Sequence, residues 1–131
     1  MTLLKSIPPY WEPMKKMFAI RVGDVDKEEE FLKSRSPLFK ADKIKIPLLI
    51  AQGANDPRVK QAEADQIVHA MQSKKIPVTY VLYPDEGHGF ARPENRLAFY
   101  AAAEQFLAKY LGGVAQPPSQ AEAKLLASIK K

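Results

Sequence analysis

The sequence contains no cysteine, only two histidines and no long apolar run. The lack of cysteine excludes a disulfide framework, a thiolate metal site and a cysteine nucleophile. No stretch approaches the roughly 20 apolar residues that a membrane-spanning helix needs, so we expect no membrane partner. The first 20 residues contain early prolines and no uninterrupted apolar segment, and we predict no signal peptide there.

Positive charge is in modest excess, with 20 Lys and Arg against 15 Asp and Glu and a net charge of +5. The excess lies mostly at residues 40–45 and at the C-terminus, rather than on one face with interleaved aromatic residues. We therefore predict no nucleic-acid partner. The 131 residues, of which 46% are hydrophobic, suffice for one domain or part of one, with a real core.

The middle of the chain has the pattern of a strand–helix–strand unit. Residues 46–53 form a short apolar run closed by glycine, which is typical of a strand buried on both faces. Residues 60–74 have the spacing of an amphipathic helix, and residues 78–83 are β-branched and aromatic. The predicted fold class is therefore α/β with parallel strands.

Helices are predicted on both sides of this unit. Before it, apolar spacing indicates a helix over residues 10–22, and Asp26 with Glu29 indicates a capping box for a second helix over residues 27–35. After it, a long helix is predicted from Pro93 until a pair of glycines ends it.

The C-terminal residues, 113–131, are predicted to form a linker and a short helix. Ser119 and Glu122 have the spacing of a capping box that opens this helix. A helix of this length is marginal alone in water, so it must dock its apolar face or fray. Leu125, Leu126 and Ile129 are the residues of that face.

Two loops that follow the predicted strands contain candidate catalytic residues. Asp56 lies in residues 53–59 and His88 in residues 84–90. Ligand sites in open parallel sheets lie outside the carboxyl ends of the strands, so we expect these two side chains at one edge. Glycines on both sides of His88 leave its imidazole exposed. A carboxylate behind an imidazole fixes its tautomer and stabilises the imidazolium formed in catalysis.

The sequences GANDPRV and DEGHGF in these loops resemble the C-terminal end of an α/β-hydrolase domain of the prolyl oligopeptidase family. This family includes prolyl oligopeptidases, dipeptidyl peptidases and acylaminoacyl peptidases, and the resemblance extends from about residue 3 to Gly112. It implies a serine peptidase that acts on a peptide substrate through an acyl-enzyme, without a cofactor. Residues 1–112 are then expected to be the C-terminal part of the catalytic domain, a partial α/β-hydrolase fold.

The same resemblance implies individual roles. Asp56 matches the triad acid and His88 the triad base, while Arg58 is expected to bind a substrate carbonyl near the scissile bond. Val59 is expected to lie close to the pocket for the residue N-terminal to that bond. The family often has Asp-Asp-Arg-Val where this chain has Pro57 in the second position.

No nucleophile accompanies this predicted pair. The fold places its serine in a G-x-S-x-G elbow before the aspartate. Ser6, Ser34 and Ser36 are the serines before Asp56, and none has glycines at that spacing. We expect a fragment that is inactive alone. The alternatives are a fragment of a dienelactone-hydrolase-like esterase and a non-catalytic fragment that only binds partners.

The other titratable residues are given structural roles. His69 lies among polar residues of the predicted helix and is expected at the surface. With Asp56 and His88 it has no metal-ligand spacing, so no metal site is predicted. Asp85 and Glu86 are predicted to form a solvated turn, and electrostatic tuning of His88 is the alternative role for them.

The aromatic residues Tyr10, Trp11 and Phe18 are predicted to pack in the core, and the alternative is that they line a substrate pocket. An apolar strand with an unpaired edge is a template for pairing with another chain, so we expect the isolated fragment to form a homo-oligomer. The N-terminal helices, with Trp11, Met14 and Phe18, are the expected contact.

Overall fold

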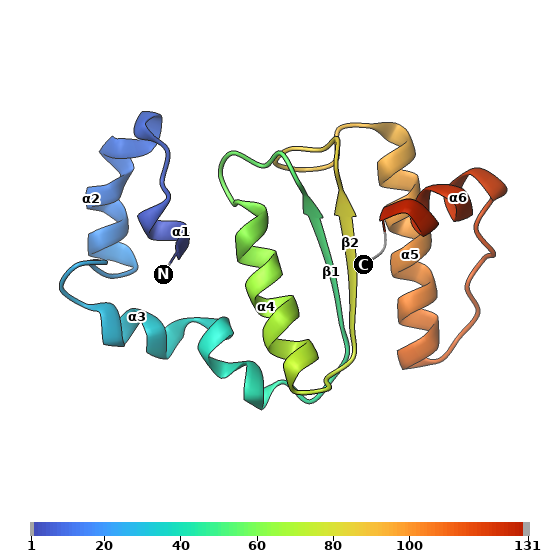
Figure 1. Ribbon diagram of the computed structural model, residues 1–131, viewed down its shortest axis with the longest axis horizontal. Coiled ribbons are helices and arrows are strands. Elements are labelled where there is room, and N and C mark those ends of the chain that lie inside the picture. The colour runs from blue at the N-terminus through green and yellow to red at the C-terminus, as the bar shows by residue number, and fades with distance from the viewer. Residues whose placement is uncertain (1, 130–131) are drawn as a thin grey trace.

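The computed structural model describes residues 2–129. Its main elements, in chain order, are α1 (Thr2–Lys5), α2 (Glu12–Arg21), α3 (Glu29–Arg35), β1 (Leu48–Gly53), α4 (Gln61–Ser73), β2 (Val78–Tyr83), α5 (Pro93–Leu111) and α6 (Gln120–Ile129). Short 3₁₀ segments lie at Pro9–Trp11 and Pro37–Lys43. The N-terminal helices flank α4 on one side of the sheet, and α5 and α6 lie on the other side (Figure 1).

The two strands pair in parallel, with Leu48 opposite Val78 and Gly53 opposite Tyr83. Because α4 connects them, the predicted strand–helix–strand unit and the α/β fold class are confirmed. The first strand begins at Leu48 rather than at residue 46. Pro47 precedes it and has no N–H group to donate to a strand ladder.

Helices cover both faces of β2. One face packs on α4, in a cluster formed by Ala64, Val68, Tyr80 and Leu82. The other packs on α5 and α6, in a cluster formed by Val81, Tyr83, Ala98, Ala102, Leu126 and Ile129. The last four residues of β2 are buried, whereas β1 is only partly buried until Gly53. The sequence of β1 is therefore typical of a fully buried strand, but in this chain β1 is only partly buried.

The N-terminal helices differ from prediction in their starts. The predicted helix over residues 10–22 begins with a 3₁₀ turn and is α-helical only over α2. The predicted capping box of α3 is wrong, because α3 has no side-chain cap at its start. Instead, the Asp24 carboxylate accepts the N–H groups of Asp26 and Lys27, and Glu28 accepts the N–H of Asp24. These bonds order a turn before the helix.

The C-terminal helices follow the sequence closely. α5 has the predicted start and end, with Pro93 in its first turn and Gly112 at positive φ after its last residue. The capping box before α6 is confirmed, since Ser119 and Glu122 exchange hydrogen bonds of 2.7 and 3.3 Å. The end of the predicted last helix, residues 130–131, lies outside the described residues. No helix within residues 2–129 is long and apolar enough to cross a membrane.

Candidate active site

Two loops meet at the carboxyl edge of the sheet, the Asp loop (residues 53–59) after β1 and the His loop (residues 84–92) after β2. Backbone hydrogen bonds join them, from the Ala54 N–H to the Tyr83 carbonyl and from the Asn55 N–H to the Glu86 carbonyl, each 2.9 Å. The Asn55 side chain donates a further bond of 2.7 Å to the Pro84 carbonyl. These bonds fix the two loops to each other without the side chains of Asp56 and His88.

Gly53 allows this close approach. A Cβ atom at this position would lie 2.2 Å from the carbonyl oxygen of Gly87 and 2.7 Å from that of Glu86. Both distances are far shorter than a non-bonded contact, and both partners are backbone atoms. Only glycine fits here without moving one loop away from the other.

Asp56 and His88 face each other across the two loops. The Nδ1 of His88 lies 2.9 Å from the Oδ2 of Asp56, and their side chains are 47% and 7% exposed. The other carboxylate oxygen of Asp56 accepts the N–H groups of Arg58 and Val59, at 2.8 and 2.9 Å. The carboxylate is thus held from behind, while the imidazole is open to an approaching group.

The electrostatics of Asp56 favour its ionised form. Burial opposes ionisation, but the hydrogen bonds from Val59, His88 and Arg58 outweigh it and lower the pKa of the carboxyl. An ionised Asp56 can only accept a hydrogen bond, so Nδ1 of His88 carries the proton in the bond between them. The second ring nitrogen, Nε2, is then the free base of the neutral ring.

Gln52 orders the Asp loop and was missed by the sequence analysis. Its side-chain amide donates to the carbonyl groups of Gly53 and Val59, at 2.9 and 3.0 Å. These two bonds close the loop at both ends around Asp56. A polar residue at the end of an otherwise apolar strand was the signal available in the sequence.

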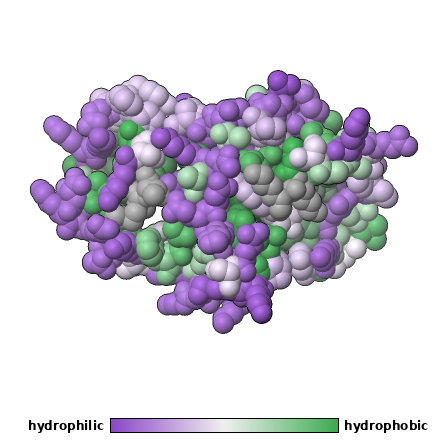
Figure 2. Space-filling view, viewed as in Figure 1, coloured by the Kyte–Doolittle hydropathy of each residue, from purple (hydrophilic) through white to green (hydrophobic). Residues whose placement is uncertain are grey.

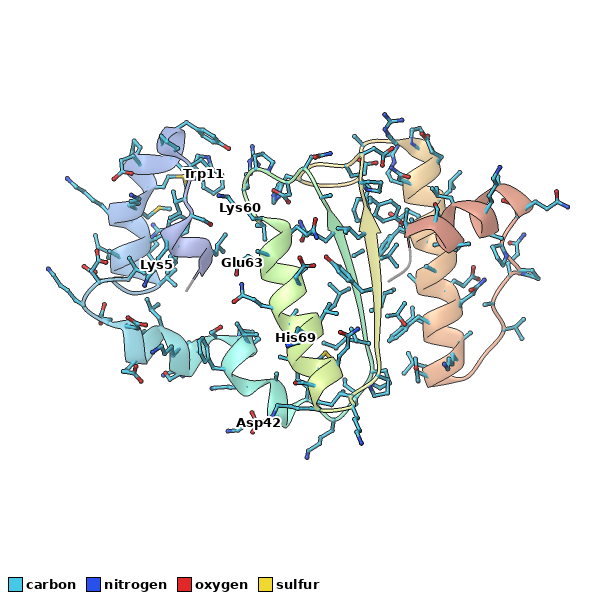
Figure 3. All side chains as sticks on the ribbon, in the orientation of Figure 1. Lys5, Trp11, Asp42, Lys60, Glu63 and His69 are labelled. Carbon is cyan, nitrogen blue, oxygen red and sulfur yellow. The ribbon has the colours of Figure 1, made fainter. Side chains whose placement is uncertain are left out.

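The two residues that the resemblance assigns to substrate lie beside Asp56. Val59 is half-buried, and Arg58 is exposed, with its guanidinium 5.4 Å from the ring centroid of Trp11. Figure 3 labels Trp11 between the N-terminal helices and the start of α4, near Lys60. Trp11 is half-buried and Tyr10 is 62% exposed, so the core prediction is wrong for Tyr10.

Glu86 also departs from the prediction. It was expected in a solvated turn, but it is buried, with 2% exposure. Its carboxylate accepts the N–H groups of Ala91 and Arg92 and the side-chain amide of Asn95. Burial alone raises the pKa of such a carboxyl, yet these bonds, with the nearby charge of Arg92, lower it. Asp85 remains exposed and pairs with Arg92 at 3.0 Å.

The remaining candidate residues lie away from this edge. His69 is exposed on α4 (Figure 3), and no cluster of three or more metal-binding side chains exists within residues 2–129. The Ser6 hydroxyl donates to the Leu3 carbonyl and the Ser34 hydroxyl to the Phe31 carbonyl. No serine in the described part of the chain is hydrogen-bonded to His88.

Comparison with known proteins places this chain in a family. The chain matches the prolyl oligopeptidase family over residues 10–114. It is 64% identical to dipeptidyl aminopeptidase BIII of Pseudoxanthomonas mexicana, over 88% of this chain and 17% of that protein. It is 50% identical to dipeptidyl peptidase family member 6 of Caenorhabditis elegans, over 99% of this chain and 18% of that protein. The chain thus spans less than a fifth of the length of these curated relatives.

Solved structures show the same fold. A crystal structure of puromycin hydrolase matches with a TM-score of 0.77 at 25% identity, over 88% of this chain and 17% of that chain. An acylaminoacyl peptidase in complex with a chloromethyl ketone matches with a TM-score of 0.73 at 23% identity, over 95% of this chain and 20% of that chain. With the family match over most of its length, this chain belongs to the prolyl oligopeptidase family of serine peptidases and has part of its α/β-hydrolase fold.

Proposed function

We propose that Asp56 and His88 are the acid and the base of a Ser-His-Asp triad that hydrolyses peptides, with the serine supplied by sequence outside this chain. The observation that carries the proposal is the 2.9 Å contact between Asp56 Oδ2 and His88 Nδ1, with the carboxylate buried and the ring exposed. This arrangement is the one that an imidazole base needs.

Each side chain has a distinct role in the proposed reaction. Nε2 of His88 takes the hydroxyl proton of the incoming serine as that oxygen attacks the peptide carbonyl, and later gives the proton to the leaving amine. Asp56 keeps the proton on Nδ1 and stabilises the imidazolium that forms between these steps. Because backbone N–H groups hold Asp56, it need not reorganise when the ring becomes charged.

Arg58 and Val59 are proposed to contact the substrate. Arg58 is exposed on the Asp loop, and its guanidinium carries N–H donors for a peptide carbonyl. Val59 offers apolar surface next to it. Two relatives are named as dipeptidyl peptidases, and short peptides with a free N-terminus are therefore the first substrates to test.

The test uses a chimera in which this chain replaces the homologous segment of the Pseudoxanthomonas mexicana relative. A fluorophosphonate probe should label the chimera and should not label this chain alone, because the Asp–His pair has no serine to activate. His88→Ala should abolish labelling of the chimera, and His69→Ala, at an exposed histidine of α4, is the matched control.

The outcomes separate the proposal from its alternatives. Labelling that survives His88→Ala contradicts the role of His88 as the base. Hydrolysis of ester but not of dipeptide amide chromogens by the chimera favours the esterase alternative. His88-dependent labelling of Ser6, Ser34 or Ser36 in the isolated chain contradicts the absence of a nucleophile.

A further inference from the structure

Glu86 is a buried carboxylate that the proposed reaction does not use. Its two oxygens accept three hydrogen bonds, from the Ala91 N–H at 2.9 Å, the Arg92 N–H at 3.0 Å and the Asn95 amide at 2.8 Å. Asn95, in the first turns of α5, is itself 1% exposed. A buried charge is costly unless donors surround it, so this arrangement is too specific to be a solvated turn.

These bonds close the His loop at its base. Glu86 precedes His88 by two residues, and the N–H groups that it accepts follow His88 by three and four residues. Within the loop that these bonds close, Gly87 and Gly89 pair with each other on either side of His88. His88 therefore lies at the tip of a short loop whose two ends are joined by one carboxylate.

The backbone of Glu86 faces the other loop. Its carbonyl oxygen accepts the N–H of Asn55, the residue directly before Asp56, at 2.9 Å. The main chain of Glu86 thus contacts the Asp loop, while its side chain contacts the start of α5. Glu86 therefore connects the Asp loop to the start of α5, two residues before His88.

We propose that Glu86 is a positioning residue, whose carboxylate clamps the His loop so that Nδ1 of His88 stays on Oδ2 of Asp56. The inference deepens the proposed function, on which the catalytic meaning of this geometry rests. The geometric claim itself concerns the described chain alone. A residue that merely caps α5 would stabilise the helix without affecting the Asp56–His88 bond.

Proton NMR of the full 131-residue chain separates these roles. The Nδ1 proton between His88 and Asp56 should give a low-field signal, to be assigned by its loss in Asp56→Asn. Glu86→Gln keeps the side-chain shape but turns an NH₂ group toward backbone donors, so at least one of the three bonds is lost. We expect the Nδ1 proton to exchange about 10- to 100-fold faster in this variant, or its signal to disappear.

The matched control is Glu94→Gln, which removes an exposed carboxylate that pairs with the Arg92 side chain at 3.5 Å. The control should keep the wild-type signal. If Glu86→Gln does not fold, Asn95→Ala removes one donor to Glu86, together with the 3.1 Å bond from Asn95 to Asp85, and keeps both backbone bonds to Glu86. The expected result is a folded chain with faster exchange of the same proton.

The inference is overturned if Glu86→Gln, or Asn95→Ala in its place, keeps the wild-type exchange rate of the Nδ1 proton. A lower melting temperature with an unchanged signal has the same meaning, since it marks a helix cap only. In the active chimera, Glu86→Gln should lower kcat and leave KM unchanged. An inactive chimera with a Glu86-dependent proton signal contradicts the proposed function and leaves the positioning role intact.

Discussion

The two halves of this chain differ in how much buried core they contain, although large apolar side chains are exposed in both, Leu111 and Val114 of the second half among them. From β1 to α6, helices cover both faces of β2, and the candidate site is held by bonds within this half. In the N-terminal helices Leu32 and Ala41 are buried, while Ile20 is 86% exposed and Phe31 and Phe39 are about half exposed. Figure 2 shows hydrophobic surface among hydrophilic surface over this region.

The residues that form the candidate site all lie in the second half, and the N-terminal helices only lie beside it. The Asp56–His88 contact is built from two strand ends, two loops and the start of α5, all in the part of the chain from β1 onward. The N-terminal helices reach the site through Trp11, which lies over the guanidinium of Arg58. The first half of the chain can therefore change its packing without moving the Asp–His pair, and the predictions below test this independence.

The largest expected effect is at the contact between the two loops. Gly53→Ala places a methyl group against backbone oxygens of the His loop and should lower the free energy of unfolding by about 1–3 kcal/mol or more. Gly87→Ala is the matched control, since its Cβ would meet only the Asn55 carbonyl oxygen, at 3.9 Å. Urea denaturation compares them. Equal stability of the two variants contradicts the close approach at Gly53.

The second prediction concerns pH. The pKa of Asp56 is lowered in the folded chain, so its contribution is present above its unfolded pKa of about 4 and is lost as the pH falls through the folded value. Asp56→Asn should therefore be less stable than wild type at neutral pH, and the gap should close below about pH 4. Urea midpoints between pH 3 and 7 measure this stability difference, with Asp42→Asn as the exposed control. A difference between wild type and Asp56→Asn that stays constant with pH contradicts the prediction.

The third prediction concerns the N-terminal helices. We expect the isolated chain to self-associate through its N-terminal helices, because apolar side chains there have no cover. Ile20→Glu should weaken the association by roughly 10- to 100-fold, as expected for losing an isoleucine that becomes buried when two chains associate. Sedimentation equilibrium at micromolar concentration measures it. A monomer at every concentration removes the homo-oligomer proposal, and wild-type association of the variant places the contact elsewhere.

The smallest effect is expected for the contact between Trp11 in the first half of the chain and Arg58 in the second. An exposed cation–π pair contributes about 0.5–1 kcal/mol, so a double-mutant cycle of Trp11→Ala and Arg58→Met should give a coupling energy of that size. The Nδ1 proton signal of His88 should not change in Trp11→Ala. A changed signal would show that the N-terminal helices do position the Asp–His pair.

Local patterns predicted most of the βαβ half. β2 and α5 have the bounds that the apolar run over residues 78–83 and the Pro93 and Gly112 signals indicate. β2 buries its last four residues and α5 buries Asn95, Ala98 and Ala102, so the residue pattern indicates both elements directly. The Asp and His loops were predicted to share an edge because parallel strands bring their carboxyl ends together.

The sequence was less informative where a side chain bonds to a distant backbone group. Glu86 reaches N–H groups five and six residues ahead, and Gln52 reaches a carbonyl seven residues ahead. Such bonds depend on the loop path, which no periodic pattern records. Tyr10 was misplaced for another reason, because aromatic spacing predicts a buried face without showing whether a partner covers it.

The central claim is that Asp56 orients His88 for peptide hydrolysis, and Asp56→Asn in the chimera tests it most directly. Asn is the same size, but its amide cannot hold the proton on Nδ1 of the ring as a carboxylate does. We predict that kcat for a dipeptide amide chromogen falls by about 10⁴-fold, with KM little changed. A kcat within about tenfold of the parent chimera would contradict the assignment of Asp56 and His88 as a catalytic pair.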